Sequence, residues 1–302
     1  MRSRVAANLA IVYLGWGSTY LAIRLMVRTI PPLLGAGARF LVAGLILLAV
    51  VRLKFGRVAL SVNSRSLAAA ALIGILLPAG GNGLVTVAER GGVPSGLAAL
   101  LVALVPVWVV VAVAAIGQRP TPRGLAGVAL GFGGVAVLFL PSGGHGHVPV
   151  GPMLVVVLAA LSWAIGSVAS GRLPMPPNTW AATGLEMVAG GLVMVVAGAA
   201  TGEGAHLHPG GISAQSLAAL GYLVVAGSLV TYSAYVWLLR SAPIGLVSTY
   251  AFVNPLVAVV LGAALLSERV TPEVGIAAAL IVVAVALISA ANPSRSRAAT
   301  DA

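Results

Sequence analysis

The chain has 302 residues, of which 60% are hydrophobic and only 8% are charged. About a quarter of the residues of a soluble domain are charged, so a water-soluble fold is excluded and the sequence predicts an integral membrane protein. Cysteine is absent, which excludes disulfides and thiolate metal sites. The formal net charge of +11 is typical of nucleic-acid-binding proteins, but its placement along the chain favours another origin.

Apolar runs long enough to cross a bilayer follow one another along the whole chain, each about 20 residues long. Proline, glycine or charged residues mark the short breaks between them. Continuous runs of this length predict helices, because the strands of a membrane barrel alternate in hydropathy. The first run has no A-x-A-like cleavage site, which indicates a retained helix and not a signal peptide. The ten predicted spans are 5–24, 33–51, 67–88, 94–116, 124–141, 150–170, 179–199, 215–238, 244–266 and 274–291.

Basic residues gather in alternate loops. If the N-terminus is cytoplasmic, 12 of the 17 basic residues lie inside, and only Asp301 opposes them there. The outer loops carry four arginines and four glutamates, which cancel. This asymmetry follows the positive-inside rule. The charge therefore indicates membrane orientation, with both termini cytoplasmic. The lipid bilayer is the predicted partner, and nucleic acid is not.

The two halves of the chain align with a shift of just under 150 residues. The alignment pairs Pro94 with Pro243, Pro106 with Pro255 and Trp16 with Trp163. Each half has five predicted spans, an odd number, so the second half must be inverted in the membrane. Inverted repeats are typical of secondary transporters, which bind substrate near the midplane between the halves.

The predicted fold is therefore an all-α membrane protein of ten transmembrane helices in two inverted five-helix repeats. The first repeat is residues 1–142, the second is 149–292, and 293–302 form a cytoplasmic tail.

The first span carries an unusual polar face. Trp16, Thr19, Tyr20 and Ile23 are spaced i, i+3, i+4 and i+7 and share one side of a helix. Polar atoms in hydrocarbon turn towards protein or a watery cavity, so this face predicts a cavity wall. The alternative is helix packing through the small residues 15, 17 and 18, and both can hold for different faces.

The third span contains Pro78 and three glycines within residues 78–83, which loosen the helix. Asn82, Thr86 and Glu89 follow on one face, and the first two are predicted to line the substrate path. The alternative is that Asn82 bonds backbone groups that Pro78 frees, while the glycines permit close packing.

Prolines in the fourth and ninth spans, Pro106 and Pro255, are hinge candidates, because a proline in a helix removes a hydrogen bond and kinks the axis. A static kink that only shapes the bundle is the alternative. The eighth span adds hydroxyls, and its tyrosines are expected to form a substrate wall. The predicted substrate-binding residues are Trp16, Thr19, Tyr20, Asn82, Thr86, Trp108, Trp163, Tyr232, Tyr235 and Asn254.

Two ionisable residues, Arg39 and Glu186, lie furthest from the loops. Intramembrane charges are costly and commonly functional, so Glu186 is the candidate for proton coupling. The alternative is that each side chain reaches the nearby membrane surface or bonds a neighbouring residue. The inverted repeat places the two residues towards opposite faces, so a direct pair is not expected.

Motifs of known enzymes and cofactor sites are absent from the sequence. His145, His147, His206 and His208 lie in loops rich in glycine and proline and are predicted to be solvated. We therefore predict no enzyme activity, no cofactor and no metal. The glycines at 124, 127 and 131 predict a packing seam, and the face of a homodimer is the other use such a seam can have.

Several motifs in order resemble the EamA family of the drug/metabolite transporter superfamily. They are residues 16–24 (WGSTYLAIR), 81–89 (GNGLVTVAE), 254–256 (NPL) and 267–269 (SER). The resemblance implies ten helices, a central path between two halves, and export or uptake of small metabolites, often amino acids or related compounds. One departure is Gln118, where the family often has the glutamate found here at 268.

The sequence thus predicts a secondary transporter, with export the favoured direction, in the plasma membrane of a bacterium-like cell. Its small-molecule substrate is expected to be neutral or zwitterionic with an apolar part, because the candidate wall is aromatic and hydroxyl-bearing with few charges. An intramembrane enzyme acting on lipid-linked substrates and a channel-like facilitator are the alternatives.

Overall fold

A computed structural model describes residues 2–117, 119–138, 148–242 and 250–290. All regular elements within these ranges are helical. The first half contains α1 (Arg2–Met26), α2 (Pro32–Phe55), α3 (Ser64–Gly74), η2 (Ile75–Gly83), α4 (Leu84–Arg90), α5 (Ser95–Val102), α6 (Val105–Ala115) and α7 (Pro122–Leu138). The second contains α8 (Val150–Ser170), α9 (Thr179–Ala200), α10 (Ala214–Tyr222), η5 (Leu223–Val230), α11 (Thr231–Ser241), α13 (Tyr250–Leu266) and α14 (Pro272–Ala290). Short 3-10 turns, η1 (Arg57–Leu60), η3 (Glu203–His206) and η4 (Pro209–Gly211), lie between helices.

Seven of the helical stretches are long and apolar enough to cross a membrane. They are Ser3–Met26, Pro32–Phe55, Ser64–Arg90, Ser95–Ala112, Val150–Ser170, Thr179–Ala200 and Ala214–Tyr235. Three shorter apolar helices, Pro122–Val137, Val253–Leu266 and Pro272–Ile288, overlap the remaining predicted runs. Large apolar side chains face outwards, for example Leu14 (62% exposed), Val196 (60%) and Val260 (64%). Such a surface favours contact with lipid, because soluble proteins rarely expose large apolar areas to water.

Two stretches of the bundle are π-helical, η2 and η5. Each is the middle of a longer helix, since α3, η2 and α4 are continuous, as are α10, η5 and α11. The two stretches occupy the third helix of each half, at positions related by the predicted shift of just under 150 residues. Only η2 contains a proline, Pro78. π-Helical turns are rare and frequently lie at functional sites.

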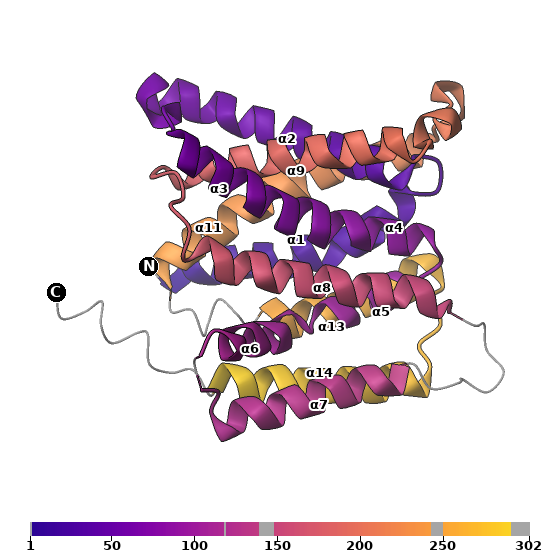
Figure 1. Cartoon of the computed structure of the whole chain (residues 1–302). Helices are drawn as coiled ribbons and strands as arrows, with labels where there is room; N and C mark the ends of the chain where they lie inside the picture. Colours follow the sequence, from indigo (N-terminus) through magenta and orange to yellow (C-terminus); the bar gives the residue numbers. More distant parts are fainter. Residues whose placement is uncertain (1, 118, 139–147, 243–249, 291–302) are drawn as a thin grey trace.

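Matching helices of the two halves pack against one another. The most extensive contacts join α2 to α9 and α7 to α14, and each pair runs antiparallel (Figure 1). Glycines allow the close approach of α2 and α9: a Cβ on Gly37 would lie 2.9 Å from the Gly191 carbonyl oxygen. Small residues serve the same purpose at helix contacts in membranes generally.

The glycines of α7 also pack within the chain. A Cβ on Gly127 would meet Ile288 of α14, and one on Gly131 would meet Val107 of α6. The predicted packing seam is therefore present, but its partners are helices of the same chain. These two glycines are covered and do not form a free face for a second copy.

α1 lies in the middle of the bundle (Figure 1). It contacts α13, α11 and α10 of the second half as well as α5 of the first. A cluster of buried apolar residues fills this region and includes Ile23, Met26, Leu100 and Leu104. α1 therefore joins the two halves and holds its polar face at their contact.

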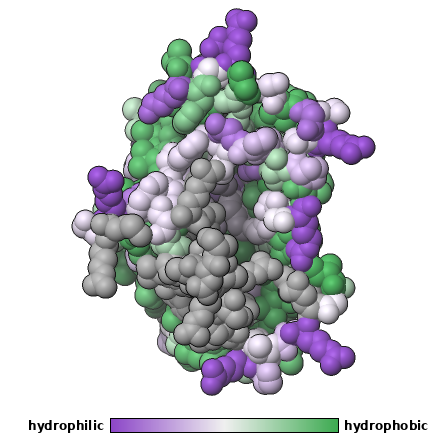
Figure 2. Space-filling model, turned by 90° about the vertical axis from the view of Figure 1, so that its left-hand side faces the viewer, coloured by the Kyte–Doolittle hydropathy of each residue, from purple (hydrophilic) through white to green (hydrophobic). Residues whose placement is uncertain are grey.

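The two ends of the bundle differ in charge. α1 begins and α14 ends at the same end, the left-hand one in Figure 1. The helix ends that meet there carry exposed basic residues, which are Arg4, Arg52, Lys54, Arg65, Arg123 and Arg172. Figure 2 looks onto this end and shows hydrophilic side chains around its rim. The predicted boundary between the halves, Gln118, His145, His147 and the tail 293–302 lie outside the described residues.

Candidate functional site

A cavity of about 90 Å³ lies between the two halves of the chain. A buried site needs roughly 10–15 Å³ to hold one water, so this one has room for several waters or a small organic group. Helices of both halves supply its wall. The lining residues are Trp16, Thr19, Tyr20, Ile23, Arg39, Gly81, Asn82, Val85, Ala99, Val102, Ala103, Val105, Pro106, Ala159, Trp163, Tyr232, Tyr250, Asn254 and Pro255.

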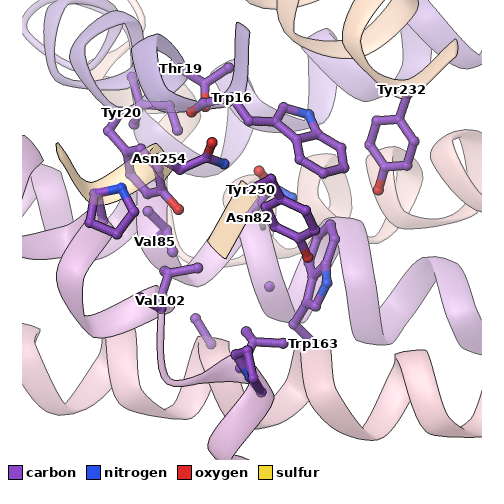
Figure 3. A pocket seen from close by; sticks show the side chains of 18 of the residues that line it. Trp16, Thr19, Tyr20, Asn82, Val85, Val102, Trp163, Tyr232, Tyr250 and Asn254 are labelled. Atoms are coloured by element: carbon purple, nitrogen blue, oxygen red, sulfur yellow. The ribbon is translucent and has the colours of Figure 1, made fainter. Parts of the chain in front are cut away.

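The polar face of α1 forms one side of this cavity, as shown in Figure 3. Trp16, Thr19, Tyr20 and Ile23 all line it. The glycines between them have a different use: a Cβ on Gly17 would lie 2.6 Å from Val257 Cβ of α13. Both interpretations of this stretch thus apply, on different faces of one helix.

Aromatic rings form a cluster around Trp16. Its ring lies 5.4 Å from that of Tyr232 and 5.3 Å from that of Tyr250, both edge to face. Tyr235 lies 4.9 Å from Trp16 but is not among the lining residues. Edge-to-face aromatic pairs are stabilising, so Tyr235 supports the wall from behind instead of forming it.

The π-helical stretch η2 brings Asn82 to the cavity opposite α8. A Cβ on Gly81 would lie 2.5 Å from Trp163 Cε3, so the indole rests directly on the glycine backbone. The Asn82 side chain makes no hydrogen bond to any other described residue and is free to face a ligand. Thr86, by contrast, is 1% exposed, does not line the cavity, and donates to the Asn82 carbonyl at 2.8 Å.

The two hinge candidates, Pro106 and Pro255, both line the cavity, but their helices differ. Pro106 lies at the start of α6, after a break at Ala103 and Leu104 that separates α6 from α5. Pro255 lies inside α13, which continues through it. The expected pair of equivalent kinks is therefore one break and one proline within a continuous helix.

Trp108 and Asn254 flank these prolines and have different surroundings. Trp108 does not line the cavity: its ring meets Phe132 of α7 edge to face at 5.0 Å. Asn254 does line it, and when the oxygen and nitrogen of its amide are exchanged, the nitrogen donates to the carbonyls of Tyr13 (3.3 Å) and Tyr250 (3.2 Å). Asn254 thereby ties α13 to α1 beside the cavity.

Arg39 and Glu186 form no ion pair within the described part of the chain. Arg39 is 3% exposed, lines the cavity, and donates through Nε to Ser228 Oγ at 3.0 Å. Glu186 is outside the lining, on α9.

Acidic residues at the right-hand end of Figure 1 are used in two ways. Glu268 accepts hydrogen bonds from the backbone nitrogens of Ser95 (2.9 Å) and Gly96 (3.2 Å), so it caps α5. Glu203 caps α2 in the same way through the nitrogens of Leu33 and Leu34. Glu89 is 0% exposed, and neither carboxylate oxygen has a hydrogen-bond partner among the described residues.

Metal-binding clusters are not formed where the structure can be described. No group of three or more His, Cys, Asp or Glu side chains gathers among the residues searched. His206 and His208 are exposed at the end of the bundle that carries Glu203.

The fold and the site define a helical membrane protein whose two halves together enclose an aromatic and polar cavity. A family model described as the EamA-like transporter family matches the chain twice, over residues 5–140 and 151–290. The uncharacterized inner membrane transporter YedA of Escherichia coli strain K12 is 40% identical over 280 residues, covering 92% of this chain and 88% of that protein. The chain belongs to the EamA-like transporter family.

Two further similarities extend over nearly the whole chain. The uncharacterized transporter YvbV of Bacillus subtilis strain 168 is 27% identical over 300 residues, covering 99% of this chain and 95% of that protein. A solved crystal structure, 21% identical, has a TM-score of 0.63 and covers 95% of this chain and 96% of its own. That structure has the same overall fold.

Several lining residues were missed by the sequence reasoning. Tyr250 precedes Asn254 by four residues and so shares its helix face, a signal that was available. Arg39 was recognised as an intramembrane charge but not as a cavity residue. Val85, Val102 and Ala159 carry no signal, because apolar residues line helix contacts and cavities alike.

Proposed function

We propose that the protein is a secondary active transporter that exports small organic metabolites, such as amino acids or related compounds, by alternating access between its halves. The observation that carries this proposal is the cavity, because both family-matched halves contribute residues to it. Transporters built from repeats bind substrate at such an interface. In this proposal Trp16, Thr19, Tyr20, Asn82, Trp163, Tyr232 and Asn254 contact the substrate directly, while Thr86, Trp108 and Tyr235 support the residues that do.

The proposed topology has ten spans, with the second repeat inverted relative to the first and both termini cytoplasmic. The antiparallel packing of α2 on α9 and of α7 on α14 supports it, since matching helices of inverted repeats run in opposite directions. The exposed basic residues at one end support the orientation. The name of the relative YedA supports a bacterial inner membrane as the location.

Alternating access needs places where helices can bend beside the substrate. The break before Pro106 and the proline inside α13 are two such places, and both touch the cavity. The π-helical stretches are two more, because their backbone hydrogen bonds are already displaced from the α-helical pattern. We propose that these four points let the halves rock about the cavity.

Glu186 is the proposed site of proton coupling. It lies outside the cavity lining, on α9, which packs against α2, the helix that carries the cavity residue Arg39. In this proposal a change in the protonation of Glu186 alters that packing and so reaches the cavity. We expect the Glu186→Gln variant to lose its response to an imposed pH gradient while still exchanging substrate at equal pH. A gradient response unchanged from the wild type would contradict this role.

Counterflow in proteoliposomes tests the transport mechanism. Vesicles loaded with each member of a metabolite panel are diluted into the same compound in radiolabelled form at low concentration. A carrier accumulates label transiently, because unlabelled substrate inside drives the exchange. A channel-like facilitator shows no such overshoot, and that result would contradict alternating access.

A further inference from the structure

One buried cation in the cavity has no partner of opposite charge. Arg39 is the sole charged residue among the 19 described residues that line the cavity. It projects from α2, two turns from the start of that helix, and its side chain is 3% exposed. A buried charge without a counter-ion is costly in a low-dielectric interior, so its presence requires an explanation.

The protein provides hydrogen-bond partners for only some of the nitrogens of the Arg39 guanidinium. Nε donates to Ser228 Oγ, and the group lies 4.7 Å from the centre of the Phe40 ring. Within the described part of the chain, the two terminal nitrogens, Nη1 and Nη2, make no hydrogen bond, and no carboxylate forms an ion pair with Arg39. Glu186, the acid within the matching helix α9, does not line the cavity.

The neighbouring π-helical stretch, η5, fixes the orientation of this group. Ser228 holds Nε, and Gly227 leaves the space that the guanidinium occupies: a Cβ there would lie 3.0 Å from Arg39 Nη2. With Nε engaged on the protein side, the terminal nitrogens remain for a ligand. A planar guanidinium in this arrangement matches the two oxygens of a carboxylate.

We infer that the cavity binds a small organic molecule with a carboxylate, whose oxygens accept hydrogen bonds from the terminal nitrogens of Arg39. The aromatic rings of Trp16, Trp163 and Tyr232 would hold the apolar body of the same molecule. This inference rests on the proposed function and deepens it by naming the substrate class. Because no acid lines the described part of the cavity, an amino group on the substrate is tolerated but is not the recognised feature.

Pairs of compounds that differ only at the carboxylate provide the test. We choose acids and their carboxamides with bodies from isobutyl to phenyl, including 3-phenylpropanoate with 3-phenylpropanamide and phenylalanine with phenylalaninamide. Binding to the full-length protein in nanodiscs is followed by tryptophan fluorescence, since Trp16 and Trp163 line the cavity. The readout is the ratio of the two dissociation constants within a pair, which does not depend on the amount of folded protein.

In the wild type, the acid of the best-binding pair should bind at least about tenfold more tightly than its amide, as expected for a charge-assisted pair. Arg39→Gln should bring this ratio close to one, and Arg39→Lys should leave an intermediate value. Ser228→Ala should lower the ratio, since Ser228 positions the guanidinium without reaching the ligand. Arg172→Gln is the matched control: that arginine is exposed, donates to the Val168 carbonyl at 3.0 Å, and should not affect the ratio.

Three results would overturn the inference: equal binding of acid and amide by the wild type, undiminished discrimination in folded Arg39→Gln, or tighter binding of inorganic phosphate than of any acid. If Arg39→Gln does not fold, the wild-type ratio and Ser228→Ala decide. Counterflow on the same protein separates the two proposals. Arg39-dependent binding without counterflow would contradict the proposed transport but not the carboxylate site. Equal counterflow of acids and amides would contradict the carboxylate requirement but not transport.

Discussion

At the scale of single residues, the polar side chains within the bundle divide into those that face the cavity and those that fasten helices together. Asn82 and Arg39 line the cavity with donors that bond no other described residue, whereas the Glu268 carboxylate accepts hydrogen bonds from the backbone at the start of α5. Ser267, which precedes Glu268, has φ 55°, a conformation uncommon for residues other than glycine. Such backbone is tolerated where a specific contact requires it, and here it turns Glu268 towards α5.

Trp16 should be the most sensitive position of the cavity wall. Its ring contacts Tyr232, Tyr235 and Tyr250, so Trp16→Ala removes cavity wall and loosens three neighbours. We expect counterflow to fall by about tenfold or more, in line with the loss of an aromatic anchor. Leu14→Ala, on the outward face of the same helix, is the control and should retain activity. Equal losses in both variants would mean that the effect is on the helix and not on the cavity.

Two glutamates at the same end of the bundle should differ in how much stability the protein loses when their charge is removed. In Glu268→Gln one of the two accepting oxygens becomes an NH2 group, which cannot accept from a backbone N–H. The free energy of unfolding should fall by about 1–3 kcal/mol, and the melting temperature in detergent should fall with it. Glu89→Gln breaks no side-chain hydrogen bond that the structure shows and should not lower it. A larger loss from Glu89→Gln than from Glu268→Gln would contradict this distinction.

At the scale of helices, glycine and the π-helical turns determine how closely neighbours approach. η2 is packed against α8 through Gly81 and Trp163, and η5 against Arg39 through Gly227. Each irregular stretch therefore places part of the cavity wall. The third helix of each half thus contributes to the site beside the regular helices α1, α2 and α13.

Adding one methyl group to α2 should separate the two halves. In Gly37→Ala the new Cβ would lie 2.6 Å from Val195 Cγ2 and 2.9 Å from the Gly191 carbonyl, both in α9. Overpacking of this kind typically costs about 1–3 kcal/mol, so the melting temperature should fall. Gly133→Ala on α7 is the control, because nothing lies within 4 Å of its Cβ position, and a helix favours alanine over glycine by roughly 1 kcal/mol. A stable Gly37→Ala protein would contradict the close packing of α2 on α9.

At the scale of the whole molecule, charge and helix direction together define two different ends. The end where α1 begins and α14 finishes (Figure 1) carries the exposed basic residues, while the opposite end carries the capping glutamates Glu203 and Glu268. Carboxylates near helix N-termini are favourable there because they meet unpaired backbone N–H groups. Packing therefore accounts for the acids of the second end, and the proposed membrane orientation would account for the bases of the first.

The absence of cysteine makes this orientation directly testable. Single cysteines are introduced at Ser64, at the start of α3, and at Ala205, just beyond α9, both of which are exposed and lie at opposite ends. A membrane-impermeant maleimide should label Ala205→Cys in intact cells and Ser64→Cys only after permeabilisation. The reverse pattern would contradict the proposed cytoplasmic termini. The parent protein without cysteine is the control for background.

The amino-acid sequence by itself determined the class of protein, the approximate position of each apolar helix, and the residues of α1 that face the cavity. These follow from hydropathy and helical periodicity, which are local properties. The tertiary structure alone decided which polar residues meet: Thr86, Trp108 and Tyr235 turn away from the cavity, whereas Arg39, Tyr250 and several small apolar residues line it. The physical reason is that helix rotation and the π-helical turns depend on packing between distant segments, such as Gly81 on Trp163 and Gly227 on Arg39, which no local pattern records.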